Sequence, residues 1–138
     1  MGKSRKPLNK KNGIIVTGKF SMETAKMYIA ASLLTFHILP LFFVFMGENG
    51  KAILLQMFLY MLNPIFLFAI GFFYGVRNGF DFKFPLLFTV ISTASAAMYY
   101  DFGDANHFVL AIMLSLCVYL IFAFVSTLVG AFIKRFLA

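Results

Sequence analysis

Four long apolar runs decide what this chain can fold into. They cover residues 27–46, 52–76, 84–100 and 108–133. A helix of about 20 apolar residues is long enough to cross the hydrocarbon core of a bilayer, and each run is close to that length. The apolar content of 62% and the charged content of 12% differ from the roughly 45–50% and about 25% usual in soluble domains. The sequence therefore predicts an all-α integral membrane protein, a bundle of four transmembrane helices over residues 27–138, and excludes a soluble enzyme.

The basic residues are distributed unevenly around these runs. Residues 1–26 hold seven of the twelve Lys and Arg residues, and four more follow the second and fourth runs. Only Lys51 lies on the opposite side. Because cytoplasmic segments are enriched in Lys and Arg, this distribution predicts a cell-membrane protein with both termini cytoplasmic. We expect residues 1–26 to be a basic cytoplasmic tail and interfacial segment that contacts anionic lipid headgroups and binds no nucleic acid.

Each run carries a polar side chain near its middle. His37, Asn63, Thr93 and Tyr119 lie roughly 13–16 Å along their helices from one end of the run. No Asp, Glu, Lys or Arg lies inside any run, although carriers coupled to protons or cations usually keep one there. One interpretation is a polar pocket or proton relay in which His37 changes charge near neutral pH. We favour the alternative that neutral side chains hydrogen-bond between helices and stabilise the bundle.

Prolines lie inside the first two runs. Pro40 and the pair Asn63-Pro64 each place a residue without an N–H in a helical segment. Such a proline removes a backbone hydrogen bond and kinks the helix. A static kink that shapes the bundle is favoured over a broken helix that lines a substrate site.

Three glycines at the end of the second run are spaced four residues apart. Gly71, Gly75 and Gly79 are predicted to form a helix-packing face, because small residues at this spacing let another backbone approach closely. Ser126 and Gly130 offer a similar face in the fourth run. Packing within the chain is favoured over packing between two copies.

The segment between the third and fourth runs carries two carboxylates and an imidazole. Asp101, Asp104 and His107 are residue types that can hold a divalent cation. A short polar turn with Asp104 or Asn106 as the N-cap of the next helix explains the same residues, and we favour it over a metal site.

No set of side chains in the sequence indicates catalysis. The runs contain no paired carboxylates, and the chain has no Ser-His-Asp set and no His-Glu-x-x-His motif. Cys117 is the single cysteine, so no disulfide can form within one chain. We expect no enzymatic activity and no cofactor.

The residues Asn63-Pro64, Tyr74-Gly75, Gly79-Phe80 and Phe84-Pro85 form a pattern along the second and third runs. This pattern resembles one found in small uncharacterised four-helix membrane proteins of bacteria. The resemblance covers about a third of the chain and implies the same fold class. No activity is attached to that group, so the resemblance implies no site residues.

Three classes of function fit these observations. The first is a non-catalytic accessory, assembly or membrane-homeostasis protein that acts through another membrane protein or a second copy of itself. The second is a small homo-oligomeric transporter or channel that uses the polar groups near the middle of the membrane. The third, least favoured, is a membrane-embedded enzyme acting on a lipid. The absence of charge within the runs favours the first class.

Overall fold

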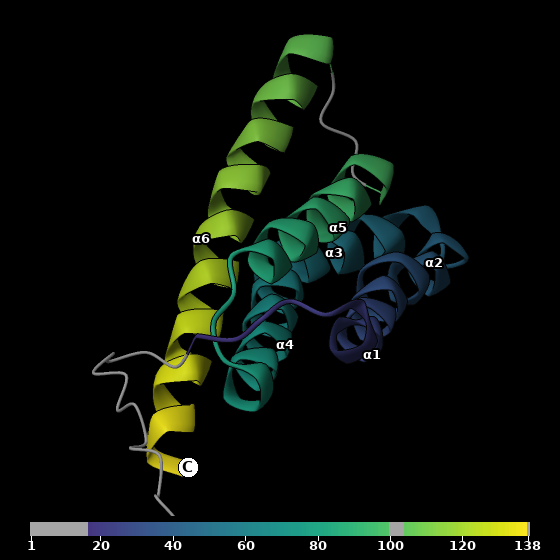
Figure 1. The fold of residues 1–138 in the computed structure, drawn as a ribbon. Helices are drawn as coiled ribbons and strands as arrows, with labels where there is room; N and C mark the ends of the chain where they lie inside the picture. Colours follow the sequence, from purple (N-terminus) through teal and green to yellow (C-terminus); the bar gives the residue numbers. More distant parts are fainter. Residues whose placement is uncertain (1–16, 100–103, 138) are drawn as a thin grey trace, which may run out of the picture.

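The computed structural model describes residues 17–99 and 104–137, and these residues are almost entirely helical (Figure 1). In chain order the helical segments are α1 Met22–Leu33, η1 Leu34–Ile38, α2 Leu39–Val44, α3 Glu48–Met57, η2 Phe58–Leu62, α4 Asn63–Asn78, α5 Lys83–Tyr99 and α6 Ala105–Leu137. The segments η1 and η2 are π-helical turns. The prediction of an all-helical chain is confirmed for the residues described.

Three continuous helices are long and apolar enough to cross a membrane. They are Met22–Val44, Glu48–Asn78 and Ala105–Leu137. The third predicted run corresponds to α5, which has 17 residues. At about 1.5 Å per residue α5 is roughly 25 Å long, slightly less than the roughly 30 Å of a hydrocarbon core. The described residues therefore contain three helices long and apolar enough to cross a membrane, and α5 is shorter than these three.

The two π-helical turns lie directly before the prolines of the first two long helices. Pro40 follows η1 and Pro64 follows η2 by two residues each. A proline ring clashes with the carbonyl four residues earlier and leaves that carbonyl without its usual donor. A locally wider turn relieves this clash. The hydroxyl of Tyr99 on α5 donates to the backbone carbonyl of His37, so a neighbouring helix supplies a donor to η1.

Helix α4 packs along the C-terminal half of α6, because small residues leave room between the two backbones (Figure 1). A Cβ atom added to Gly75 would overlap the Thr127 carbonyl and lie 2.9 Å from the backbone nitrogen of Ala131. A Cβ atom added to Gly130 would lie 2.9 Å from the backbone nitrogen of Val76. Backbone approach through small residues is a main source of helix association in membranes.

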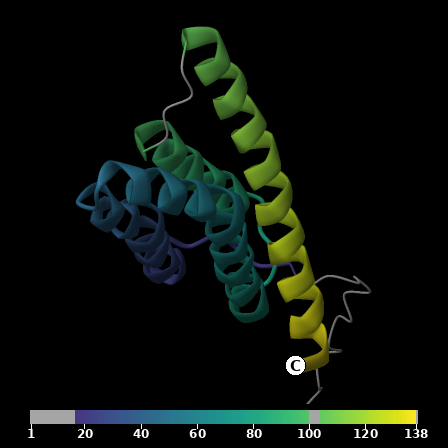
Figure 2. The ribbon, with the colours of Figure 1, turned by 180° about the vertical axis from the view of Figure 1, so that it is seen from behind.

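The N-terminal half of α6 lies apart from the other helices. The first buried residue of α6 is Tyr119, and Figures 1 and 2 both show this end extending beyond the rest of the molecule. Val109, Leu110, Met113 and Leu114 are each more than half exposed. Helix α6 therefore has its C-terminal half packed in the bundle and most residues of its N-terminal half exposed.

The start of the described chain, the turn after α4 and the end of α6 meet at one end of the molecule. The backbone N–H of Gly18 donates to the Phe80 carbonyl at 2.7 Å. The Lys134 ammonium donates to the Arg77 carbonyl at 2.9 Å. We call this end the basic end, because most cations of the described residues lie in or beside these segments. They are Lys19, Lys26, Arg77, Lys83, Lys134 and Arg135.

Candidate functional site

Two of the four polar residues predicted near mid-membrane form a buried hydrogen bond. The side-chain amide of Asn63 donates to the Tyr119 hydroxyl at 3.0 Å. Asn63 is 0% exposed and Tyr119 is 3% exposed. Asn63 opens α4 directly after η2, and Tyr119 is the first buried residue of α6. The contact therefore joins the second and fourth predicted spans where α6 leaves the bundle.

The other two polar residues do not join this pair through a hydrogen bond within the described residues. The Thr93 hydroxyl and His37 Nδ1 are buried and have no hydrogen-bond partner among residues 17–99 and 104–137. The same holds for Asn63 Oδ1. The contact of His37 with α5 is made by its backbone carbonyl, which accepts a hydrogen bond from the Tyr99 hydroxyl. Among these four residues there are one hydrogen-bonded pair and three buried polar atoms without a partner, and within the described residues no chain of hydrogen bonds connects all four.

A groove of about 460 Å3 lies beside Tyr119, between the second long helix and the free half of α6. We call it the α6 groove. Its lining residues are Leu59, Tyr60, Pro64, Ala111, Leu114, Ser115, Val118, Tyr119 and Phe122. The lining is apolar except for hydroxyl groups, so the groove suits a hydrophobic helix or an acyl chain better than a charged solute.

Gly71 and Gly75 lie at the contact between α4 and α6, whereas Gly79 has another position. A Cβ atom on Gly71 would overlap the Ser126 side chain. Gly79 follows the last residue of α4 and has a φ of 85°, a backbone conformation that favours glycine. The packing face on α4 thus consists of Gly71 and Gly75, and Gly79 ends the helix.

Asp81 is a residue whose role the sequence analysis missed. One carboxylate oxygen accepts from the backbone N–H of Phe84 at 2.7 Å, and the other accepts from the Tyr74 hydroxyl. Asp81 therefore caps the N-terminus of α5 and ties it to α4. An Asp just before a helical run is a known N-cap signal and could have identified the first contact. Nothing in the sequence pairs Asp81 with Tyr74.

Aromatic rings surround this capping contact. The rings of Tyr74 and Phe84 stack with centroids 3.6 Å apart, and Tyr28 of α1 meets Tyr74 edge-on at 5.3 Å. An edge-on pair such as Tyr28 and Tyr74 adds stabilisation beyond the area it buries. The cluster holds α1, α4 and α5 together at the basic end.

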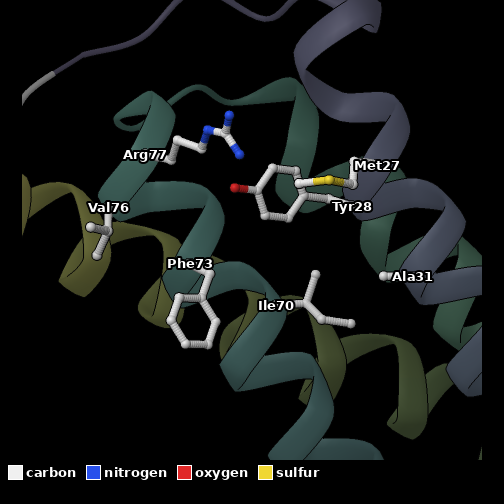
Figure 3. A pocket seen from close by; sticks show the side chains of 7 residues that line it. All are labelled: Met27, Tyr28, Ala31, Ile70, Phe73, Val76 and Arg77. Carbon is white, nitrogen blue, oxygen red and sulfur yellow. The ribbon is translucent and has the colours of Figure 1, made fainter.

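A second groove, of about 480 Å3, runs between α1 and α4 beside this cluster (Figure 3). We call it the α1–α4 groove. It is lined by Met27, Tyr28, Ala31, Ile70, Phe73, Val76 and Arg77. In Figure 3 the Tyr28 hydroxyl and the Arg77 guanidinium point toward each other at one end of the groove, and the remaining lining is apolar.

The polar turn before α6 is described only from Asp104 onward. Asp101 lies outside the described residues. His107 Nδ1 and Asp104 Oδ2 are 3.1 Å apart and both side chains are exposed. Among the described residues no group of three His, Cys, Asp or Glu side chains could hold a metal ion.

Replacing Tyr119 with Phe is expected to destabilise the protein by about 1 kcal/mol, because hydrogen bonds between membrane helices average about 0.6 and reach about 1.7 kcal/mol. The change removes the acceptor of the Asn63 amide and keeps the aromatic ring. Unfolding by sodium dodecyl sulfate in mixed micelles, followed by circular dichroism, measures the effect. Tyr60→Phe is the matched control because Tyr60 is 72% exposed. Equal effects of the two substitutions would contradict a structural role for the Asn63–Tyr119 bond.

Comparison with known proteins gives no match for this chain. No protein-family model, no curated protein and no solved structure matches it. The resemblance to small four-helix membrane proteins of bacteria therefore stays a prediction.

Proposed function

We propose that the chain is a non-catalytic cell-membrane protein of four spans that acts by holding another membrane protein, in an accessory, assembly or membrane-homeostasis role. The observation that carries the proposal is the α6 groove beside the free half of α6. Helix α6 is about 50 Å long at ~1.5 Å per residue, and most residues of its N-terminal half are exposed. A hydrophobic helix of a partner would fill this space.

The lining of the α6 groove supports a helical partner. Ala111 and Ser115 lie one turn apart on the groove face of α6, the spacing that lets a second helix approach closely. Small residues one turn apart also allow close packing within the chain, where Gly71 and Gly75 of α4 lie against α6. Pro64, on the opposite wall, adds no N–H that would need a partner.

The proposal includes a fourth span formed by α5, with both termini cytoplasmic. Helix α5 starts beside the basic end, where Asp81 caps it, and α6 finishes there. Only residues 100–104 connect the last residue of α5 to the first of α6, and the six steps from Tyr99 to Ala105 reach at most about 22 Å. If α6 crosses the membrane, α5 must therefore carry the chain from the basic end toward the other side. The excess of cations at the basic end supports a cytoplasmic location.

A photo-crosslinking amino acid placed at Ser115 in the native membrane tests the partner role. We expect a discrete adduct with a second membrane protein, identified by mass spectrometry, because Ser115 lines the α6 groove. Met113 is the matched control, since it lies on the same helix, is 62% exposed and does not line the groove. No adduct at Ser115, or equal adducts at both positions, would contradict the proposal.

A homo-oligomeric transporter or channel is the second candidate, and three buried polar atoms without hydrogen-bond partners support it. Asn63 Oδ1, the Thr93 hydroxyl and His37 Nδ1 are buried without hydrogen-bond partners among the described residues, and such atoms are costly unless water, a ligand or another chain satisfies them. This candidate predicts that Ser115 crosslinks only to a second copy. It also predicts that flux in proteoliposomes depends on pH and that His37→Gln abolishes this dependence. Flux in His37→Gln that still depends on pH between 5 and 8 as it does in the wild type would exclude a relay through His37.

A further inference from the structure

The α1–α4 groove is polar at one end and apolar along the rest of its length, as a lipid molecule is. Its polar groups, Arg77 and Tyr28, lie at the basic end, and apolar side chains continue from them toward Ala31 and Ile70 (Figure 3). Arg77 lies seven positions after Ile70 in α4, which is about 10 Å along the helix axis at ~1.5 Å per residue. The groove also opens sideways, because Met27 is 57% and Phe73 is 62% exposed. In a membrane this open side faces acyl chains.

Tyr28 is held in place with its hydroxyl group free. The residue is 9% exposed, and its ring packs edge-on against Tyr74 at 5.3 Å and Phe84 at 6.1 Å. The hydroxyl makes no hydrogen bond to residues 17–99 or 104–137, and it points into the groove toward Arg77 (Figure 3). A hydroxyl held at the mouth of an apolar groove can donate to a ligand that carries an acceptor oxygen.

The charge at the groove mouth is positive. Asp81, a carboxylate near Arg77 in the chain, already accepts from Tyr74 and the backbone of Phe84. Within the described residues the only ion pair is between Asp104 and His107, at the start of α6 and so at the opposite end of that helix from Lys134. The Lys134 ammonium lies nearby, because it contacts the Arg77 carbonyl, but Lys134 does not line the groove. The Arg77 guanidinium is thus available for an external anion, and its planar fork matches phosphate oxygens.

We propose that the α1–α4 groove binds one anionic phospholipid. Its phosphate lies between the Arg77 guanidinium and the Tyr28 hydroxyl, and one acyl chain follows the apolar wall past Ala31 and Ile70. The site differs from general attraction of the basic tail to the bilayer, because it uses a defined cation, a defined hydroxyl and a shaped groove. It depends on membrane location alone, so failure of the partner experiment above leaves it unaffected.

Native mass spectrometry of the full chain, released from detergent with an equimolar mixture of dioleoylphosphatidylglycerol and dioleoylphosphatidylcholine, tests the site. We expect the wild type to retain one phosphatidylglycerol in preference to phosphatidylcholine. Arg77→Gln is expected to lower this retention roughly tenfold, and Tyr28→Phe roughly threefold. The first variant removes a charged hydrogen-bond donor and the second a neutral one, and hydrogen bonds from charged groups are stronger. Arg135→Gln is the matched control, since it removes a nearby charge that does not line the groove.

A variant in the apolar wall distinguishes a shaped lipid groove from diffuse charge attraction. Ala31→Leu narrows the groove without touching its polar end, and we expect it to reduce phosphatidylglycerol retention while helicity by circular dichroism stays unchanged. This variant and Tyr28→Phe keep the test valid if Arg77→Gln fails to fold. Equal losses in Arg77→Gln and Arg135→Gln would show diffuse attraction and overturn the proposal. Displacement of the lipid by excess inorganic phosphate, or full retention in Ala31→Leu, would also overturn it, because the groove would then bind phosphate and not an acyl chain.

Discussion

Replacing Gly75 with Ala is expected to destabilise the protein by about 2–3 kcal/mol, the upper part of the range for overpacked sites. The added methyl group would overlap the Thr127 carbonyl and lie 3.1 Å from the Gly130 Cα. Backbone atoms of two packed helices cannot rotate away as a flexible side chain can, so α4 and α6 must separate. Alanine is a better helix former than glycine by about 1 kcal/mol, so intrinsic propensity alone predicts the opposite sign.

Gly50→Ala is the matched control for this substitution. Gly50 lies in α3, and a Cβ atom there would meet nothing within 4 Å. We expect it to be neutral or stabilising by up to about 1 kcal/mol. The test compares the free energy of unfolding in mixed micelles of the Gly75→Ala and Gly50→Ala proteins. A Gly75→Ala protein as stable as Gly50→Ala would show that α4 and α6 do not touch at this position.

Replacing Asp81 with Ala is expected to cost about 2–4 kcal/mol, the second large effect. The change removes the cap of α5, worth about 0.5–2 kcal/mol, and leaves the buried Tyr74 hydroxyl without its charged acceptor, worth about 1.5–3 kcal/mol. Tyr74 is 0% exposed, so water does not replace the lost partner. We expect the loss to appear as reduced unfolding free energy and as faster proteolysis at the turn between α4 and α5.

A double-mutant cycle separates the two contacts of Asp81. Tyr74→Phe removes the hydroxyl alone, and the combined Asp81→Ala and Tyr74→Phe protein should lose less than the sum of the single variants. Asp104→Ala is the control, because that carboxylate is exposed and pairs only with exposed His107; its effect should be about 0.5 kcal/mol or less. Additive single effects would show that Tyr74 and Asp81 do not interact.

The helices themselves could be predicted because the apolar runs are long and their boundaries polar. The second run, predicted at residues 52–76, lies within Glu48–Asn78. The fourth, predicted at residues 108–133, lies within the longer helix Ala105–Leu137. Helical backbone continues past the apolar run at both ends, since polar residues such as Asn106 and Lys134 are compatible with a helix in water or headgroups. Length of apolar sequence therefore sets the span but not the helix ends.

The contacts between helices could be predicted only in part. Spacing along a helix gives the depth of a side chain in the membrane, and Asn63 and Tyr119 have similar depth and do meet. Depth does not fix the direction in which a side chain points, and His37 and Thr93 are not bonded to this pair within the described residues. The π-helical turns before Pro40 and Pro64 rotate the following residues, which a regular helical projection does not reproduce.

Accessibility of single cysteines in intact and permeabilised cells tests the four-span arrangement most directly. In a Cys117→Ser background, Phe82→Cys reports the turn between α4 and α5, and Asp104→Cys reports the start of α6; both native residues are exposed. We predict that a membrane-impermeant thiol reagent labels Asp104→Cys in intact cells and labels Phe82→Cys only after permeabilisation. Labelling of both positions from the same side would show that α5 does not cross the membrane and would contradict the account.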